Sequence, residues 1–130
     1  MAYDSTLRFV IGDSPSFTVN VVVLASDLAA KGYLTVKKGM FDADPGVLQK
    51  IITPTNTPGI GQIISTGAAP ANTPGSVFAV YRFDLTNADT AALAPQDFFF
   101  DVQTRTASGA IATPVTGILT MTPQITTTIT

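Results

Sequence analysis

The side chains that most often carry enzyme chemistry are missing from this sequence. Neither histidine nor cysteine occurs, and all nine acidic residues are aspartate. Without histidine the chain lacks the commonest general base and the commonest transition-metal ligand, and without cysteine it lacks a thiolate nucleophile. A serine nucleophile would need a lysine as its base, and no lysine is placed beside a serine by any recognisable spacing. We therefore predict that the protein is not an enzyme and uses no cofactor.

Two pairs of aspartates could still do chemistry. Asp97 and Asp101 share one face of an expected strand, and paired carboxylates are the machinery of glycoside hydrolysis. Asp42 and Asp44 stand in a turn and could contribute oxygens to a calcium ion, although no EF-hand spacing follows them. We expect solvated carboxylates at strand rims and turns in both places, with calcium near Asp42 and Asp44 as the open alternative.

The composition favours association with other proteins. Charged residues make up 12% of the chain, against about 25% in ordinary soluble domains, while hydrophobic residues reach 45%. The formal net charge of −2 gives no electrostatic reason to expect nucleic acid as a partner. No apolar run approaches the roughly 20 residues that span a bilayer, so membrane insertion is not expected. A weakly charged, apolar-rich chain tends to assemble.

Strand signals recur along the chain, separated by glycine, proline and other turn residues. One short helical segment interrupts them, with Thr86 or Asn87 as its N-cap and Pro95 beyond its end. These features predict an all-β fold, an immunoglobulin-like antiparallel β-sandwich of seven to nine strands with one short helical turn. A jelly roll or small barrel is the alternative. The expected strands cover residues 7–11, 17–23, 33–37, 49–53, 60–65, 77–85, 97–105 and 111–122.

The expected domain organisation is one sandwich with two extended ends. Residues 7–122 form the sandwich, residues 1–6 an N-terminal arm, and residues 123–130 a C-terminal arm. The N-terminal residues lack a basic region followed by an apolar stretch, so no secretory signal is expected. The C-terminal arm is uncharged and β-prone, and it could add a strand to a neighbour.

The C-terminal half resembles the small immunoglobulin-like modules of tailed bacteriophages. A capped helical turn at 85–93 leads into the aromatic strand Phe98-Phe99-Phe100-Asp101, and a turn at 107–109 precedes a strand with an internal glycine at Gly117. The N-terminal domains of baseplate upper proteins and related tail or decoration proteins show this order. Segment 12–19, which leads into the second expected strand, and segment 34–37 fit the same pattern. The resemblance implies a virion structural protein, assembled in the host cytoplasm.

Apolar residues on the solvent side of strands mark the candidate contact sites. If Phe98 and Phe100 face the core, Phe99 must point outward, because side chains alternate along a strand. The same logic places further apolar side chains outside, and the C-terminal arm adds two. Burial under loops is the alternative reading of each position. The candidate protein contacts are Val22, Phe78, Val80, Phe99, Ile125 and Ile129.

Together these observations predict a non-enzymatic bacteriophage structural protein of the tail, baseplate or capsid surface. Its expected partners are other virion proteins and copies of itself, reached by packing of sheet faces and strand addition, with no small-molecule substrate. The alternative is an exported cell-surface adhesion or carbohydrate-binding module on the same sandwich. A sugar site would usually show exposed aromatic platforms, and the chain has no tryptophan.

Overall fold

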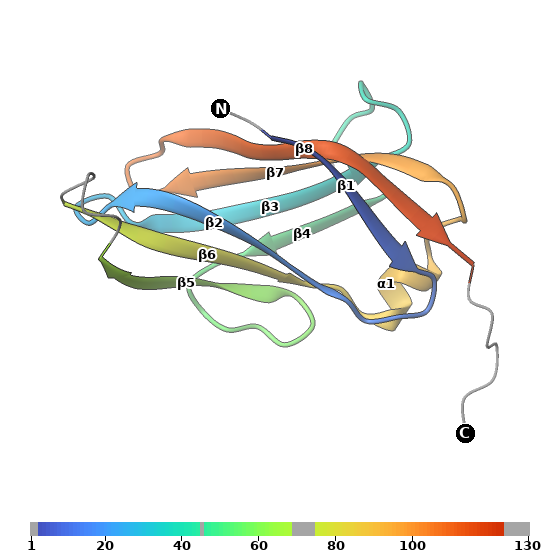
Figure 1. Ribbon diagram of the computed structural model, residues 1–130, viewed down its shortest axis with the longest axis horizontal. Coiled ribbons are helices and arrows are strands. Elements are labelled where there is room, and N and C mark those ends of the chain that lie inside the picture. Colours follow the sequence, from blue (N-terminus) through green and yellow to red (C-terminus); the bar gives the residue numbers. More distant parts are fainter. Residues whose placement is uncertain (1–2, 45, 69–74, 124–130) are drawn as a thin grey trace.

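The computed structural model describes residues 3–44, 46–68 and 75–123 of the chain, and Figure 1 shows their arrangement as two packed layers of strands. A single short helix, α1, occurs among these residues. The strands are β1 (Tyr3–Val10), β2 (Ser16–Leu24), β3 (Ala29–Lys37), β4 (Leu48–Ile52), β5 (Gly61–Ala68), β6 (Ser76–Asp84), β7 (Asp97–Thr106) and β8 (Ile111–Thr122), and α1 spans Asn87–Ala91.

The strands form a five-stranded sheet in the order β1-β8-β7-β3-β4 and a three-stranded sheet in the order β2-β6-β5. In an immunoglobulin domain the third, sixth and seventh strands share one sheet, and variable-type domains add a further strand beside the third. The second, fifth and fourth strands then make up the other sheet. If β2 is taken as strand B, the order in both sheets matches this scheme. The predicted all-β, immunoglobulin-like sandwich with one short helix is confirmed.

The pairing of β1 departs from the predicted antiparallel arrangement. β1 runs parallel to β8, from Tyr3 opposite Val115 to Val10 opposite Thr122. It therefore belongs to the five-stranded sheet, and the chain crosses to the other sheet before β2 begins. The strand also starts earlier than expected, because Tyr3–Thr6 lie in the sheet where an arm was predicted. Of the predicted C-terminal arm, residues 124–130 lie outside the described part of the chain.

The core lies between the two sheets and is built from alternate residues of the strands. On β6 the side chains of Ala79, Tyr81 and Phe83 are fully buried, while their neighbours face outward. On β7 the same alternation buries Phe98 and Phe100. Period-two burial of this kind is expected when one face of each sheet packs against the other sheet.

The helix α1 is fixed at one end of the sandwich by local and long-range hydrogen bonds. Thr86 caps it: its hydroxyl accepts from the Asp89 backbone N–H at 3.1 Å, and the Asp89 carboxylate accepts from the Thr86 N–H at 2.8 Å. The fully buried Thr90 hydroxyl donates to the carbonyl of Asp13 at 2.7 Å and accepts from the Gly12 N–H at 3.0 Å. The helix is thereby attached to the β1–β2 turn. Among the described residues, no helix is long and apolar enough to cross a membrane.

Candidate protein interface

Apolar side chains meet on the outer face of the three-stranded sheet. Val22 on β2 lies opposite Phe78 on β6, and Val80 on β6 lies opposite Ile64 on β5. Phe78 and Val80 are two residues apart on one strand, so their side chains share this face. Val22 is 44% exposed and Ile64 is 37% exposed. We call these four residues the outer patch; they form a continuous apolar strip across all three strands.

The outer patch contains three of the six residues predicted from the sequence as contacts. Val22, Phe78 and Val80 point outward as expected, and the structure brings them together with Ile64, which the sequence analysis did not single out. Phe99 lies on the other sheet, so it belongs to a different surface. Ile125 and Ile129 lie outside the described residues. A contact role for each of these side chains stays a prediction.

Phe99 lines a hollow of about 260 Å³ on the outer face of the five-stranded sheet. Its alternation with the buried Phe98 and Phe100 is as predicted, and its side chain is partly exposed. The hollow mixes apolar and polar side chains from β3, β7, β8 and the β3–β4 loop. Its lining residues are Thr35, Lys37, Met40, Phe99, Phe100, Asp101, Thr113, Thr116 and Gly117.

Two charged residues that line this hollow, Asp101 and Lys37, interact electrostatically with each other and with Asp44 outside its lining. Burial raises the pKa of Asp101; the positive charge of Lys37 works against that rise, and the negative charge of Asp44 adds to it. Lys37 in turn forms an ion pair with Asp44 across 2.9 Å. The positive charge of Lys37 therefore acts on two carboxylates, of which Asp101 is the more buried.

The two aspartates considered for calcium are bound by different partners. Asp42 accepts from the backbone N–H of Gly39 at 2.8 Å, whereas Asp44 pairs with Lys37. Over residues 3–44, 46–68 and 75–123 no group of three or more acidic side chains is arranged to hold a metal ion. The two aspartates considered for glycoside hydrolysis also have different surroundings. Asp97 accepts from the Thr120 hydroxyl at 2.7 Å, whereas Asp101 faces the hollow.

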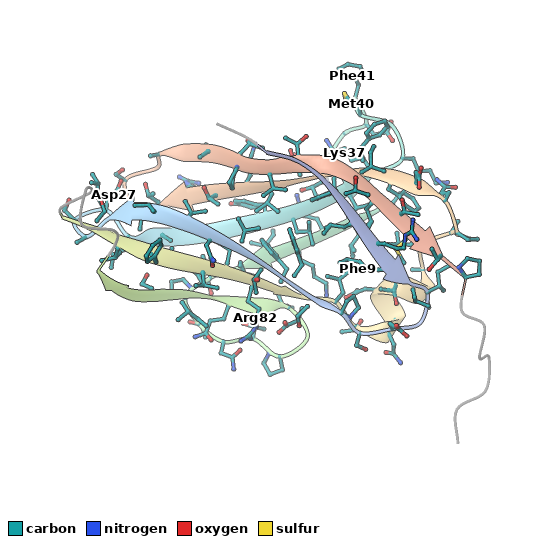
Figure 2. The ribbon with its side chains drawn as sticks, viewed as in Figure 1. Phe9, Asp27, Lys37, Met40, Phe41 and Arg82 are labelled. Carbon is teal, nitrogen blue, oxygen red and sulfur yellow. The ribbon has the colours of Figure 1, made fainter. Side chains whose placement is uncertain are left out.

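The tip of the β3–β4 loop presents two large apolar side chains to solvent. Phe41 is 97% exposed and Met40 is 60% exposed. Figure 2 shows both on a loop that projects beyond the five-stranded sheet, near Lys37. Sequence reasoning missed these residues because it followed strand alternation, which says nothing about loops. The available signal was a pair of large apolar residues between Gly39 and Asp42, inside a segment of turn-forming composition.

Comparison with known proteins gives little beyond this geometry. No protein-family model matches the chain, and no curated protein matches it. A solved structure from a study of host recognition and biofilm formation by aggregative adherence fimbriae of enteroaggregative Escherichia coli aligns over 92% of this chain and 92% of its own, with 13% sequence identity and a TM-score of 0.41. A likeness with so low a score carries no argument about function. The resemblance to bacteriophage modules likewise stays a prediction.

Proposed function

We propose that this protein is a non-enzymatic structural module of a larger assembly, which it joins by packing its outer sheet surfaces against protein neighbours. The observation that carries the proposal is the outer patch. Four apolar side chains from three adjacent strands share one solvent-facing surface, with Val22 and Ile64 each more than a third exposed. Continuous apolar surface on a sandwich of this size is a common sign of a protein contact.

Two further features support a contact role. The hollow beside Phe99 and the loop tip at Met40 and Phe41 place more apolar surface on the opposite side of the sandwich. A module with apolar surface on both sides can touch two neighbours at once, as a subunit within an array must. The low content of charged residues suits a chain whose surface is covered in its working state.

The assembly that we propose is a virus particle. This step rests on the resemblance of segments 12–19, 34–37 and 85–121 to small modules of bacteriophage tails, baseplates and capsid surfaces. The alternative setting is a cell surface, where the same sandwich would act as an adhesion or carbohydrate-binding module. The two settings differ in what the isolated protein should do: a structural module binds protein neighbours, whereas an adhesion module binds glycans as a monomer.

The test is incorporation. A tagged copy, produced together with the other proteins of its natural source, should sediment with particles at constant stoichiometry. Ile64→Lys places a charge in the outer patch at an already exposed position, and it should reduce incorporation by about tenfold or more, because an unpaired charge is costly to bury in a contact. Gln103→Lys, an exposed position on the other sheet, is the matched control. Normal incorporation of Ile64→Lys would refute the role of the outer patch, and specific glycan binding by a monomer absent from particles would favour the adhesion module.

A further inference from the structure

The strand β2 is an edge that the fold leaves open. In the common immunoglobulin arrangement the first strand lies beside the second, in the same sheet. Here β1 pairs with β8 in the other sheet, so no described strand lies on the free side of β2. Figure 1 shows β2 paired with β6 on one side only. The sandwich therefore presents a nine-residue strand whose outward backbone groups are available for pairing.

β2 also lacks the features that usually keep an edge strand from pairing. Its sequence, Ser16–Leu24, contains no charged residue, no proline and no glycine. Its register with β6 runs through nine consecutive pairs without a bulge. Charges, prolines and bulges are the usual protection of exposed edges, and a long uncharged edge without them invites a second strand.

The other edges of the two sheets are protected. β1 carries Arg8, and the five-residue β4 carries Lys50. β5 is uncharged, but its free side is occupied where it begins: the Gly61 carbonyl accepts from the Thr57 N–H at 3.0 Å, and the Ile63 N–H donates to the Thr53 carbonyl at 2.8 Å. From Ser16 to Val23 no such bond from a loop reaches the free side of β2 among the described residues. Protection is missing from β2 in particular.

β2 is complementary to itself in the antiparallel direction. Suppose that two copies pair about a twofold axis through Asn20. Odd-numbered residues of one copy then lie opposite odd-numbered residues of the other, so core-facing side chains meet core-facing ones. Phe17 then lies opposite Val23 and Val19 opposite Val21, which extends both cores. Phe17 and Val21 are only partly buried in the single chain, so this pairing would cover apolar surface that is now partly exposed. No like charges meet, since the strand carries none.

We propose that two copies of this chain pair through their β2 strands and so join the two three-stranded sheets into one. The inference rests on the proposed function, and it names the partner, a second copy, and the edge that the partner uses. The outer patch stays on the open face of the joined sheet, where the patches of both copies remain available to other proteins. Self-pairing through β2 and incorporation through the outer patch are therefore separable.

The first experiment places a charge on the twofold axis. Analytical ultracentrifugation across a concentration series should show a dimer for the unchanged chain. Asn20→Lys brings two lysines face to face at an exposed position, and it should weaken the dimer about a hundredfold, because like charges opposed in an interface repel each other. Asn20→Asp should do the same, while an equal mixture of the two variants should pair again. Gln103→Lys, the control, should remain dimeric.

The second experiment uses the absence of cysteine from the sequence. Facing residues of an antiparallel pair lie about 4.5–5.5 Å apart between Cα atoms, within the range of a disulfide. Oxidation of Asn20→Cys should therefore yield a covalent dimer, whereas Gln103→Cys, on the other sheet, should still pair but form no covalent dimer. A monomeric unchanged chain, or a dimer indifferent to every change at Asn20, would overturn the proposal. A dimer lost only on removal of residues 124–130 would also overturn it, in favour of pairing through the C-terminal segment. A loss of incorporation in Ile64→Lys with an intact dimer tests the proposed function separately.

Discussion

Lys50 and Asp89 form an ion pair that joins the edge strand β4 to the helix α1. Both side chains are largely buried, with 11% and 20% of their surface exposed. The Lys50 ammonium group also donates to the Gly59 carbonyl at 2.8 Å, and the Asp89 carboxylate accepts from the capping residue Thr86. One pair of charges thus connects β4, the β4–β5 loop and the start of α1.

Replacing Lys50 by methionine should destabilise the fold by about 2–3 kcal/mol, because the Asp89 carboxylate would remain largely buried without its partner. Chemical denaturation of both proteins at neutral pH measures the difference. Lys31→Met, at an exposed position of β3, should change the free energy of unfolding by less than about 0.5 kcal/mol. Equal effects of the two substitutions would show that the ion pair contributes nothing specific to the free energy of unfolding.

The same pair predicts a dependence of stability on pH. Burial acts to raise the pKa of Asp89, but the hydrogen bonds from Lys50 and Thr86 outweigh it and hold the pKa below its usual range. A carboxyl group with a lower pKa in the folded state stabilises the fold above its unfolded pKa of about 3.9, and this contribution is lost as the pH falls through the folded value. Denaturation from neutral pH down to about pH 3 should show this loss, with a shallower decline in Lys50→Met.

Asp101 should have the opposite dependence. Its pKa is raised in the folded protein, chiefly by burial, so its contribution is most favourable below about pH 3.9 and is lost as the pH rises through the folded value. Asp101→Asn should therefore increase stability at neutral pH, by less than about 1 kcal/mol because the carboxylate is only half-buried. The gain should vanish at low pH. Asp13→Asn, at an exposed turn position, controls for the loss of one negative charge.

Thr90→Val should cost about 2 kcal/mol, although the two side chains have nearly the same shape. The change removes the hydroxyl that donates to the Asp13 carbonyl and accepts from the Gly12 N–H, and it leaves both backbone groups of the β1–β2 turn without this partner. Thr90→Ser retains the hydroxyl and should cost less. Thermal unfolding distinguishes them, and a valine variant as stable as the serine variant would contradict the assigned role of the hydroxyl.

Gly61→Ala should be the most damaging of these substitutions, at about 3 kcal/mol or more. Gly61 has a φ of 134°, and a Cβ atom there would lie 2.0 Å from the backbone carbonyl oxygen of Arg82. Gly109 also has a positive φ, of 97°, but a Cβ atom would meet nothing within 4 Å. Gly109→Ala should therefore cost only about 1–2 kcal/mol of backbone strain. The difference between the two variants, measured by chemical denaturation, isolates the close approach of β5 to β6.

Local alternation predicted the eight strands and the direction of their side chains, although β1 and β3 each begin four residues earlier than expected. The period-two patterns around Val19, Tyr81 and Phe100 correctly separate core from surface, because an amphipathic strand has only one way to face a core. The same alternation identified Val22, Phe78 and Val80 as outward. It could not place Phe99 on a different sheet from them, since the division of strands between sheets depends on pairings between distant segments.

The features that sequence reasoning missed are long-range ones. The parallel pairing of Tyr3–Val10 with β8 joins segments more than a hundred residues apart, and no local signal specifies it. The ion pair of Lys50 with Asp89 and the bond of Thr90 to Asp13 likewise depend on where the strands carry these residues. Met40 and Phe41 lie in a loop, where no periodicity distinguishes an exposed side chain from a buried one.

The parallel pairing of β1 with β8 has a mechanical consequence. The chain enters this pair at Tyr3, opposite Val115, and leaves it at Thr122, opposite Val10. Seven residue steps separate these points along the strands, which is about 23 Å. A force that pulls the two ends apart would act lengthwise and in opposite directions on the two strands. It would load their hydrogen bonds in shear, all together, where an antiparallel hairpin pulled from its open end would unzip one bond at a time.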